Sequence, residues 1–266
     1  MQRMRSVLFV PGDRPERFDK AIASGADVIV IDLEDAVLPD GKARARELVG
    51  AWPNSSRAVI VRTNSVDTEW FKDDLAMLRE SGYQAMMLPK AQSVHDLDAV
   101  LSICEPTMQI YPLIETVKGI VSQREIAAHP STQRLIFGSV DFSKDSGIMD
   151  EAGWLPFKVE MVIASKLAGL NGPIDGTLLS WDDSEYLKQQ ASISRGLGFA
   201  GRLCIHPSQV APVNQGMLAS EDQIAWAKRV VSAYQVCVAG AIVVDNKLVD
   251  KPVYELAREW LAQLPD

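Results

Sequence analysis

The chain has 266 residues, of which 47% are apolar, with a formal net charge of −8 and a pI near 5.0. This size and composition allow a large buried core, in one large domain or two small ones. The acidic balance argues against nucleic acid or an anionic membrane as a partner. Three widely spaced cysteines, Cys104, Cys204 and Cys237, favour free thiols over a disulfide framework. Neither a signal peptide nor an apolar run of about 18 residues is found, so a cytoplasmic protein is expected.

Eight short runs of apolar and β-branched residues alternate with amphipathic stretches along the chain. The predicted strands cover residues 6–10, 27–32, 58–62, 85–89, 109–114, 134–138, 172–176 and 201–205. The stretches between them repeat apolar residues every three or four positions, which is typical of helices. Several of these helices are expected to stop at a glycine just before the next strand, at Gly25, Gly82, Gly169 and Gly198.

Fully apolar strands that alternate with single helices indicate an α/β fold with a parallel sheet covered on both faces. Eight such units in about 250 residues predict a closed (β/α)8 TIM barrel, with an open doubly wound sheet as the alternative. Further on, residues 241–253 show a hairpin pattern that turns at Asp245 and Asn246, and a last helix follows. The predicted division is a barrel domain over residues 1–238 and a C-terminal lid segment of hairpin and helix over residues 239–266.

Polar residues follow the strands at the points where a barrel would gather them. In a parallel barrel the C-terminal ends of the strands converge on one mouth, where active sites are built. The predicted mouth residues are Pro11 to Arg14, Asp32, Glu34, Asp35, Arg62, Asn64, Lys90, Glu115, Asp141, Asp175 and His206. Each one alone could be a solvated turn residue or a helix cap, but the whole set points to a functional site.

Glu115 and Asp141 stand one strand-helix unit apart and would lie at adjacent strand ends. Two carboxylates on strands about 4.8 Å apart can reach one hard cation. Mg²⁺ is usually held by one or two carboxylates, with waters and substrate oxygens completing its shell. Each of the two residues could instead cap the helix that follows it, and their spacing does not separate the two interpretations.

Arg62 and Lys90 also have two interpretations each. Arg62 could grip a substrate carboxylate with its planar fork or form an ion pair with Asp32 or Glu34, and both can hold together. Lys90 could form a Schiff base, as strand-end lysines in barrels sometimes do. Because several acids face the same mouth, we expect Lys90 to stay protonated and to act as a charge.

The histidines do not form a metal-binding pattern. His206 follows the last strand, where it could serve as a general base or a metal ligand. No second histidine stands at metal spacing, because His95 and His129 lie in polar helical contexts. A structural or substrate-contacting role is therefore favoured for His206.

Several motifs, in order and at compatible spacing, resemble those of the citrate lyase beta-subunit-like family of the HpcH/HpaI aldolase superfamily, whose relatives include malyl-CoA and citramalyl-CoA lyases. They are RSVLFVPGDRPERFDKAIASGADVIVIDLEDAV, VRTN, LPK, LIET, the GSVD strand end, LCIHPSQVAPVN and NKLVDKPV. The resemblance implies a TIM-barrel enzyme that cleaves a short 3-hydroxyacyl-CoA. The substrate would be of the malyl-CoA or citramalyl-CoA type, and the products an acyl-CoA such as acetyl-CoA and a 2-keto acid.

The resemblance also implies which residues carry this reaction. Mg²⁺ would bind to Glu115 and Asp141 and hold the hydroxyl and carboxylate oxygens of the substrate, which lowers the energy of the alkoxide as the carbon-carbon bond breaks. Arg62 would hold the substrate carboxylate. The residues implied to orient Arg62 and water on the metal are Asp32, Glu34 and Asp35. Glu34 is counted among the catalytic residues with Arg62.

The N-terminal loop and nearby basic residues are implied to bind CoA. Arg14 and Lys20 would contact its phosphates, and the backbone of Pro11 and Gly12 would approach the pantetheine arm, which a glycine permits. Lys90 is also counted among the substrate-binding residues.

Asp250 in NKLVDKPV is implied to reach the active site of a neighbouring subunit and to exchange a proton with the enolate carbon. The active form would then be a homo-oligomer, a trimer or a hexamer. The sequence alone equally allows Asp250 to be a turn residue after the hairpin.

Two departures from the family pattern leave the acyl group and the keto acid open. Val140 replaces an acidic neighbour of Asp141, and Phe157 to Glu160 stand where the family commonly has Tyr-Ala-Arg-Ser. The alternatives on the same fold are a malate or citramalate synthase that hydrolyses the thioester and a beta subunit of a citrate lyase complex that acts on an acyl-carrier protein. A non-catalytic CoA-binding barrel is the alternative from another class.

Overall fold

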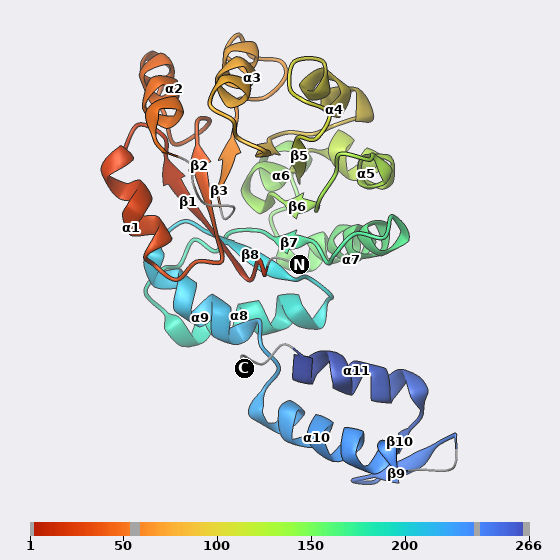
Figure 1. Ribbon diagram of the computed structural model, residues 1–266. Coiled ribbons are helices and arrows are strands. Elements are labelled where there is room, and N and C mark those ends of the chain that lie inside the picture. The colour runs from red at the N-terminus through yellow and green to blue at the C-terminus, as the bar shows by residue number, and fades with distance from the viewer. Residues whose placement is uncertain (1–2, 54–58, 237–239, 263–266) are drawn as a thin grey trace.

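A closed barrel of eight parallel strands, in the order of the chain, forms the centre of the molecule (Figure 1). The computed structural model describes residues 3–53, 59–236 and 240–262. The strands are β1 (Ser6–Pro11), β2 (Val28–Asp32), β3 (Val59–Arg62), β4 (Ala85–Leu88), β5 (Gln109–Ile114), β6 (Ile136–Phe137), β7 (Ile174–Asp175) and β8 (Gly201–Cys204). Strand β1 pairs with both β2 and β8, which closes the barrel. The predicted TIM barrel is confirmed, and the open sheet is excluded.

Helices follow the strands and surround the barrel (Figure 1). They are η1 (Pro15–Arg17), α1 (Phe18–Ile22), η2 (Pro39–Gly41), α2 (Lys42–Ala51), α3 (Phe71–Glu80), α4 (Val94–Leu101), α5 (Val117–Ala128), α6 (Ser139–Ser146), α7 (Glu151–Leu167), α8 (Ser184–Gly196), η3 (Pro207–Gln209) and α9 (Val210–Gly216). The sixth unit carries two helices, because α6 starts directly after β6 and α7 follows it. Within the described ranges, no helix has the length and apolar character that a membrane span needs.

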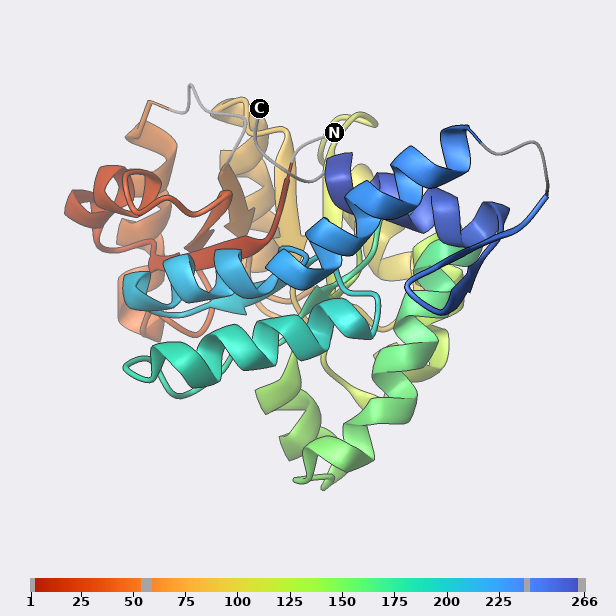
Figure 2. The same cartoon turned by 90° about the horizontal axis from the view of Figure 1, so that it is seen from below.

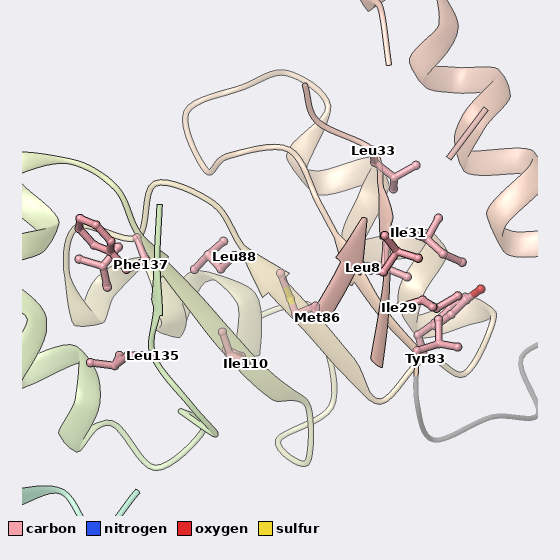
Figure 3. Packing of buried hydrophobic residues seen from close by; sticks show 14 of the residues in the cluster. Leu8, Ile29, Ile31, Leu33, Tyr83, Met86, Leu88, Ile110, Leu135 and Phe137 are labelled. Carbon is pink, nitrogen blue, oxygen red and sulfur yellow. The ribbon is translucent and has the colours of Figure 1, made fainter. Parts of the chain in front are cut away.

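The two faces of each strand build two separate layers of core, because successive side chains point to opposite sides. The inward-facing layer fills the barrel and includes Val7, Val28, Val30, Ile60, Met87, Leu113, Ile136, Ile174 and Leu203. The outward-facing layer packs under the helices and includes Leu8, Ile29, Ile31, Met86, Leu88, Ile110 and Phe137 (Figure 3). Each fully buried side chain of this kind contributes about 1.5–3 kcal/mol to the stability of the folded state. Burial on both faces explains why the strands read as continuous apolar runs.

Glycines end three barrel helices as predicted. Gly82, Gly169 and Gly198 follow α3, α7 and α8 with φ of 70°, 72° and 101°. In each case the next residue donates its backbone N–H back into the helix, which satisfies a terminal carbonyl. These bonds are Tyr83 N to Leu78 O at 3.0 Å, Leu170 N to Ser165 O at 2.9 Å and Phe199 N to Ser194 O at 3.1 Å. Gly25 also has a left-handed φ of 82°, but α1 has already ended at Ile22, so it shapes the turn instead.

The C-terminal unit, residues 221–262, has a small core of its own. It consists of α10 (Glu221–Gln235), β9 (Ile242–Val244), β10 (Lys247–Val249) and α11 (Lys251–Ala262). The buried residues that join these elements are Ala227, Val230, Val244, Val249 and Ala257. The predicted hairpin turn is confirmed, since Asp245 and Asn246 have φ of 50° and 59° between the two strands. Figures 1 and 2 show α10 and α11 side by side, next to the barrel.

The predicted domain boundary between residues 238 and 239 lies outside the described residues. Helix α10 lies before that boundary, although it packs against the hairpin and α11. We propose a boundary between α9, which ends at Gly216, and α10, which begins at Glu221. This division keeps each buried cluster within one unit.

Gly169→Ala should lower the free energy of unfolding by about 1 kcal/mol, because alanine is strained at a left-handed φ even where its Cβ has open space. Gly196→Ala is the matched control, since Gly196 ends α8 in helical backbone and is equally open. It should leave stability unchanged or raise it slightly. Urea unfolding of both variants checks this. Equal midpoints would mean that the left-handed cap places no demand on residue 169.

Candidate functional site

The C-terminal ends of the strands enclose a cavity of about 400 Å³, the mouth cavity. Its charged lining residues are Asp32, Asp35, Arg62, Glu115 and Asp141. Asp32, Arg62 and Glu115 each lie two positions after an inward-facing strand residue. Because strand side chains alternate, that spacing turns all three into the mouth.

Arg62 at the end of β3 is held by Asp32 at the end of β2. Nε of Arg62 donates to Oδ1 of Asp32 at 2.7 Å, and Nη2 donates to Oδ2 at 2.6 Å. The guanidinium carbon lies 4.8 Å from the centre of the Phe9 ring, and Arg62 is only 8% exposed. Burial opposes the charge, but Asp32 and nearby carboxylates outweigh it and raise the pKa of Arg62 above its ordinary value. The predicted ion pair is therefore confirmed.

Glu34 links Arg62 to Lys90. Its Oε2 lies 3.1 Å from Nη1 of Arg62, and its Oε1 accepts a hydrogen bond from Nζ of Lys90. Burial raises the pKa of Glu34, although Arg62 and Lys90 oppose that shift. For Lys90, burial lowers the pKa, but the hydrogen bond and charge of Glu34 more than offset it and the pKa is raised. Lys90 is therefore protonated, as expected, and its geometry does not favour a Schiff base.

Glu115 is almost fully buried between β4 and β6. Its Oε1 accepts a hydrogen bond from the backbone N of Lys90 at 2.9 Å, and its exposure is 2%. A Cβ at Gly138 would come within 2.5 Å of both Cβ and Oε2 of Glu115, so only glycine leaves room for this carboxylate. Helix α5 is capped by Thr116, whose hydroxyl accepts from the backbone N of Gly119. Glu115 is thus not a helix cap.

Asp141 lies in the first turn of α6 and not at a strand end, which corrects the prediction of its position. Its side chain lines the same cavity as Glu115 and has no hydrogen-bond or ion-pair partner among the described residues. Burial, together with the negative charges of Glu34 and Asp141, raises the pKa of Glu115 to about 8, against the effect of Arg62. A cation bound between Glu115 and Asp141 would remove this unfavourable interaction.

The donor set therefore fits a magnesium ion held by two protein carboxylates. Within residues 3–53, 59–236 and 240–262, no group of three or more His, Cys, Asp or Glu side chains is placed to hold a metal. The remaining ligands would be water and substrate, which is how Mg²⁺ is usually bound. Asp32 and Glu34 are not spare ligands, because they are engaged by Arg62 and Lys90.

The glycine of the N-terminal loop packs against strand β2. Gly12 donates its N–H to the carbonyl of Asp32 at 2.8 Å, and a Cβ there would lie 2.8 Å from that same oxygen. This packing accounts for the glycine within the chain, and the approach of its backbone to the pantetheine arm stays a prediction. Pro11 does line the mouth cavity. Arg14 and Lys20 are exposed and do not line that cavity, and their contact with CoA phosphates stays a prediction.

Asp175 does not face the mouth, contrary to the prediction. It comes one position after the inward-facing Ile174 and therefore points outward, between the barrel and the helices. Its Oδ2 contacts Nζ of Lys158 at 2.7 Å, Oγ of Ser194 at 2.6 Å and Nη1 of Arg202 at 3.1 Å. Burial works against the charge, but Arg202 and Lys158 hold the pKa of Asp175 below its ordinary value. Lys158, in the segment that departs from the family pattern, is thus a structural partner of β7.

Two other predicted rim residues also have structural partners. His206 is exposed and caps η3, with Nδ1 2.7 Å from Oγ of Ser208 and its ring 4.9 Å from the ring of Trp181. Asn64 is buried, and both its backbone N and its Nδ2 donate to Oδ2 of Asp74, at 2.8 and 2.7 Å. His206 thus has a structural role as a cap, a contact of His206 with substrate stays a prediction, and Asn64 anchors the loop after β3 to α3.

Sequence reasoning missed Lys42, which fixes the loop that carries Glu34. Its Nζ donates to the carbonyls of Leu33 and Glu34, both at 2.8 Å, and the residue is 5% exposed. The spacing of residues in α2 already indicates that Lys42 is buried. Lys42 shares the buried face of α2 with Ala45 and Val49, so a lysine stands where an apolar residue is expected.

Asp250 is not brought to the mouth cavity of its own chain. It precedes α11 in the C-terminal unit, and its Oδ1 accepts a hydrogen bond from the backbone N of Val253 at 3.3 Å. A helix cap therefore explains the residue within one chain. Of the cysteines, Cys104 and Cys204 are free and buried, whereas Cys237 lies outside the described residues. Burial raises the pKa of Cys204 to about 12, so this thiol is not an activated nucleophile.

Asp175→Asn should strongly destabilise the protein near neutral pH, because it leaves the buried Arg202 and the half-buried Lys158 without their carboxylate. The folded pKa of Asp175 is depressed, so its stabilisation is complete above the ordinary carboxyl range and is lost as pH falls through the folded value. The difference in unfolding free energy between wild type and variant should therefore be constant from pH 5 to pH 7 and shrink below about pH 4. Denaturant unfolding across this range measures it. Loss of activity at unchanged stability would instead place Asp175 in the reaction.

Comparison with known proteins agrees with this geometry. The family model described as HpcH/HpaI aldolase/citrate lyase matches residues 5–207. A (3S)-malyl-CoA thioesterase of Cereibacter sphaeroides is 33% identical over 97% of this chain and 94% of its own length. An L-malyl-CoA/beta-methylmalyl-CoA lyase of the same species is 32% identical over 92% and 90%. The crystal structure of the protein CitE from Mycobacterium tuberculosis, in complex with magnesium, acetoacetate and coenzyme A, superposes with a TM-score of 0.89 at 32% identity, covering 98% of this chain and 97% of CitE. The chain belongs to the HpcH/HpaI aldolase/citrate lyase family, a family of carbon-carbon lyases.

Proposed function

We propose that this enzyme is a Mg²⁺-dependent carbon-carbon lyase that cleaves a short 3-hydroxyacyl-CoA of the malyl-CoA or citramalyl-CoA type. The products are an acyl-CoA such as acetyl-CoA and a 2-keto acid. The observation that carries the proposal is the convergence of Glu115 and Asp141 on one cavity beside a buried arginine. The CitE complex with magnesium, acetoacetate and coenzyme A supports the assignment of ion and substrate class.

Glu115 and Asp141 are the residues that would hold the ion. When bound, magnesium supplies a Lewis acid that stabilises the negative charge developing on the substrate oxygens. Gly138 and the backbone N of Lys90 fix the position of Glu115 before any ligand binds. This preorganisation means that the site does not have to rearrange when the charge develops.

Arg62 binds the substrate carboxylate in this proposal. Asp32 occupies Nε and one edge of Nη2, whereas Nη1 lies 3.1 Å from Oε2 of Glu34 and 3.6 Å from Oδ2 of Asp35. The substrate carboxylate therefore competes with these two acids for the outward edge of the guanidinium. Because Asp32 locks the guanidinium plane, the carboxylate is received in one orientation. Lys90 adds a second positive charge beside it.

During cleavage, the electrons of the bond between the α- and β-carbons move to the thioester as an enolate, and the hydroxyl carbon becomes the carbonyl carbon of the 2-oxo acid. We propose Glu34 as the base that receives the hydroxyl proton. Its Oε2 is buried and accepts no hydrogen bond among the described residues, and its raised pKa suits a general base. Asp250 of a neighbouring subunit then gives a proton to the enolate carbon.

Binding of the CoA portion uses exposed residues at the rim. Arg14 and Lys20 are solvent-accessible on the N-terminal loop and α1, where they are free to meet phosphates, and Pro11 lies at the edge of the mouth cavity. The requirement for Asp250 in trans makes the active form a homo-oligomer, a trimer or a hexamer. The buried free thiols of Cys104 and Cys204 fit a reducing compartment such as the cytoplasm.

A second candidate activity is hydrolysis of the thioester. It is favoured by the 33% identity to the (3S)-malyl-CoA thioesterase, which is as high as the identity to the lyases. The same cavity and the same ion would serve this reaction, but water would attack the thioester carbonyl. The products tell the two apart, because hydrolysis releases a free hydroxy acid and CoA and leaves the carbon skeleton intact.

Incubation with malyl-CoA and citramalyl-CoA, with and without Mg²⁺, tests the assignment. A lyase releases glyoxylate or pyruvate only with the ion, whereas a thioesterase releases the CoA thiol without a keto acid. Asp141→Asn should lower keto-acid formation by about 100-fold or more, since it removes one of two metal carboxylates.

Thermal stability of Asp141→Asn should be nearly unchanged, because the side chain has no partner to lose in the described part of the chain. Asp145→Asn is the matched control. Asp145 lies on the same helix and accepts from the backbone N of Val117, a bond that asparagine can also accept. If the two variants have equal activity, the assignment of Asp141 to the ion fails.

Mixing Arg62→Lys protomers with Asp250→Asn protomers should restore part of the activity that each variant lacks. In a mixed oligomer, some sites receive an intact Arg62 from one chain and an intact Asp250 from another. Both substitutions are conservative by design, because Arg62→Ala would strand the buried Asp32, whereas asparagine still caps α11. No recovery after subunit exchange, verified by mass spectrometry, would contradict a shared site.

A further inference from the structure

A second cavity, the basal cavity, lies at the N-terminal end of the barrel, opposite the mouth. Its volume is about 210 Å³, and its lining includes Arg134 just before β6 and Phe199 and Ala200 just before β8. The arginines that line it are Arg3, Arg5, Arg134 and Arg195. This concentration of positive charge stands out in a chain whose net charge is −8.

Arg134 is buried at this cavity, and no described residue serves as its counter-ion. It stands two positions before the inward-facing Ile136, so it points toward the barrel axis, and it is 6% exposed. Among the residues that the structure describes, none accepts a hydrogen bond from its guanidinium or pairs with it, and the phenol of Tyr111 is its only electrostatic neighbour. A buried charge without a partner is strongly unfavourable.

Arg195 approaches the same cavity from the C-terminal end of α8. One of its nitrogens, Nη2, donates to Oε1 of Gln223 at 2.7 Å, while its Nε is buried without a partner in the described residues. Burial lowers the pKa of both Arg134 and Arg195. These two side chains carry five N–H donors each, most of which have no protein acceptor.

Asp27, an acidic residue beside the cavity, is already paired with Arg5. Asp27 accepts from Nε and Nη2 of Arg5 at 2.9 and 2.8 Å, and it also accepts the backbone N–H of Arg5. Asp27 is therefore fixed on Arg5 and leaves Arg134 and Arg195 uncompensated.

We propose that the basal cavity binds a phosphate-type oxyanion, which Arg134 and Arg195 contact from two sides. Guanidinium groups recognise phosphate through paired charge-assisted hydrogen bonds. A tetrahedral anion directs oxygens toward donors on different elements, as the start of β6 and the end of α8 require, whereas a carboxylate presents two oxygens in one plane. The cavity is smaller than the roughly 300–1,000 Å³ of drug-sized pockets, so the ligand is inorganic phosphate or the end of a small phosphomonoester.

The proposal is independent of the reaction at the mouth. It predicts that the order of stability of wild type and Arg134→Met depends on whether phosphate is present. Without oxyanion, Arg134 is an unpaired buried charge, so Arg134→Met should be at least as stable as wild type in Tris chloride. With phosphate, wild type should gain stability by binding, whereas Arg134→Met should not. An arginine with a purely structural role would lower stability in both buffers when replaced.

Calorimetric titration and thermal unfolding of the full chain, at constant ionic strength, test this with inorganic phosphate, methyl phosphate and acetate. Wild type should bind phosphate or methyl phosphate saturably, and acetate much more weakly. Arg134→Met and Arg195→Met should each weaken binding by about tenfold or more, which corresponds to the loss of one charge-assisted contact. Preference for methyl phosphate over phosphate would identify an esterified ligand.

A control variant separates this cavity from other arginines. Arg229→Met removes an exposed arginine that pairs with Asp245 in the C-terminal unit. It should keep full phosphate binding. If Arg134→Met does not fold, Arg195→Met decides alone. Absence of saturable binding by wild type, binding retained in the basal-cavity variants, or equal affinity for acetate would overturn the proposal.

Discussion

The buried ion pair between Arg62 and Asp32 is the interaction on which the geometry of the mouth depends. The two residues are register partners at the ends of adjacent strands, so the closure of the barrel brings them together without any loop. Their two parallel hydrogen bonds fix the guanidinium plane, and the remaining nitrogen Nη1 lies 3.1 Å from Oε2 of Glu34. Glu34 then ties this pair to Lys90, whose backbone in turn holds Glu115. Arg62, Lys90 and Glu115 thus belong to one connected network, and Asp141 lines the same cavity from helix α6.

Carboxylates outnumber cations in this network, and that imbalance prepares the mouth for a metal ion. Asp32 and Glu34 satisfy the two basic residues, whereas Glu115 and Asp141 face the cavity without a cation of their own. The pKa of Glu115 is raised for the same reason, because ionising one more buried acid beside other carboxylates is unfavourable. The protein therefore holds its own positive charges in place and leaves its excess negative charge where an ion can bind.

Most of the fold and part of the site could be predicted from the sequence, because both follow from the alternation of apolar strands and amphipathic helices. Eight strands, the closed barrel and the hairpin at Asp245 and Asn246 come from local patterns that tertiary contacts reinforce. Glu115 and Arg62 were found because they end strands. The alternation of side chains along each strand also predicts orientation, since it places Asp32, Arg62 and Glu115 inward and Asp175 outward.

The errors arose where packing between distant segments decides the outcome. The helical spacing of α2 marks Lys42 as buried, but a linear pattern does not show the loop carbonyls that it binds. Nor does it show that Gly12 packs against the backbone of β2. Asp141 belongs to a helix that starts directly after a two-residue strand, so its side chain was correctly grouped with Glu115 but placed on the wrong element. Helix α10 was assigned to the barrel because its partners, the hairpin and α11, follow it in the chain.

The fit between Gly138 and Glu115 has a consequence for how such enzymes can diverge. Because the carboxylate fills the space of a missing side chain, every replacement at position 138 collides with it while glutamate remains. Because the Cβ of Glu115 alone comes within 2.5 Å, a shorter side chain at position 115 does not remove the collision. Glycine at position 138 is therefore tied to the path of the neighbouring backbone as well as to the acid, so a lineage that abandons the acid still keeps this glycine.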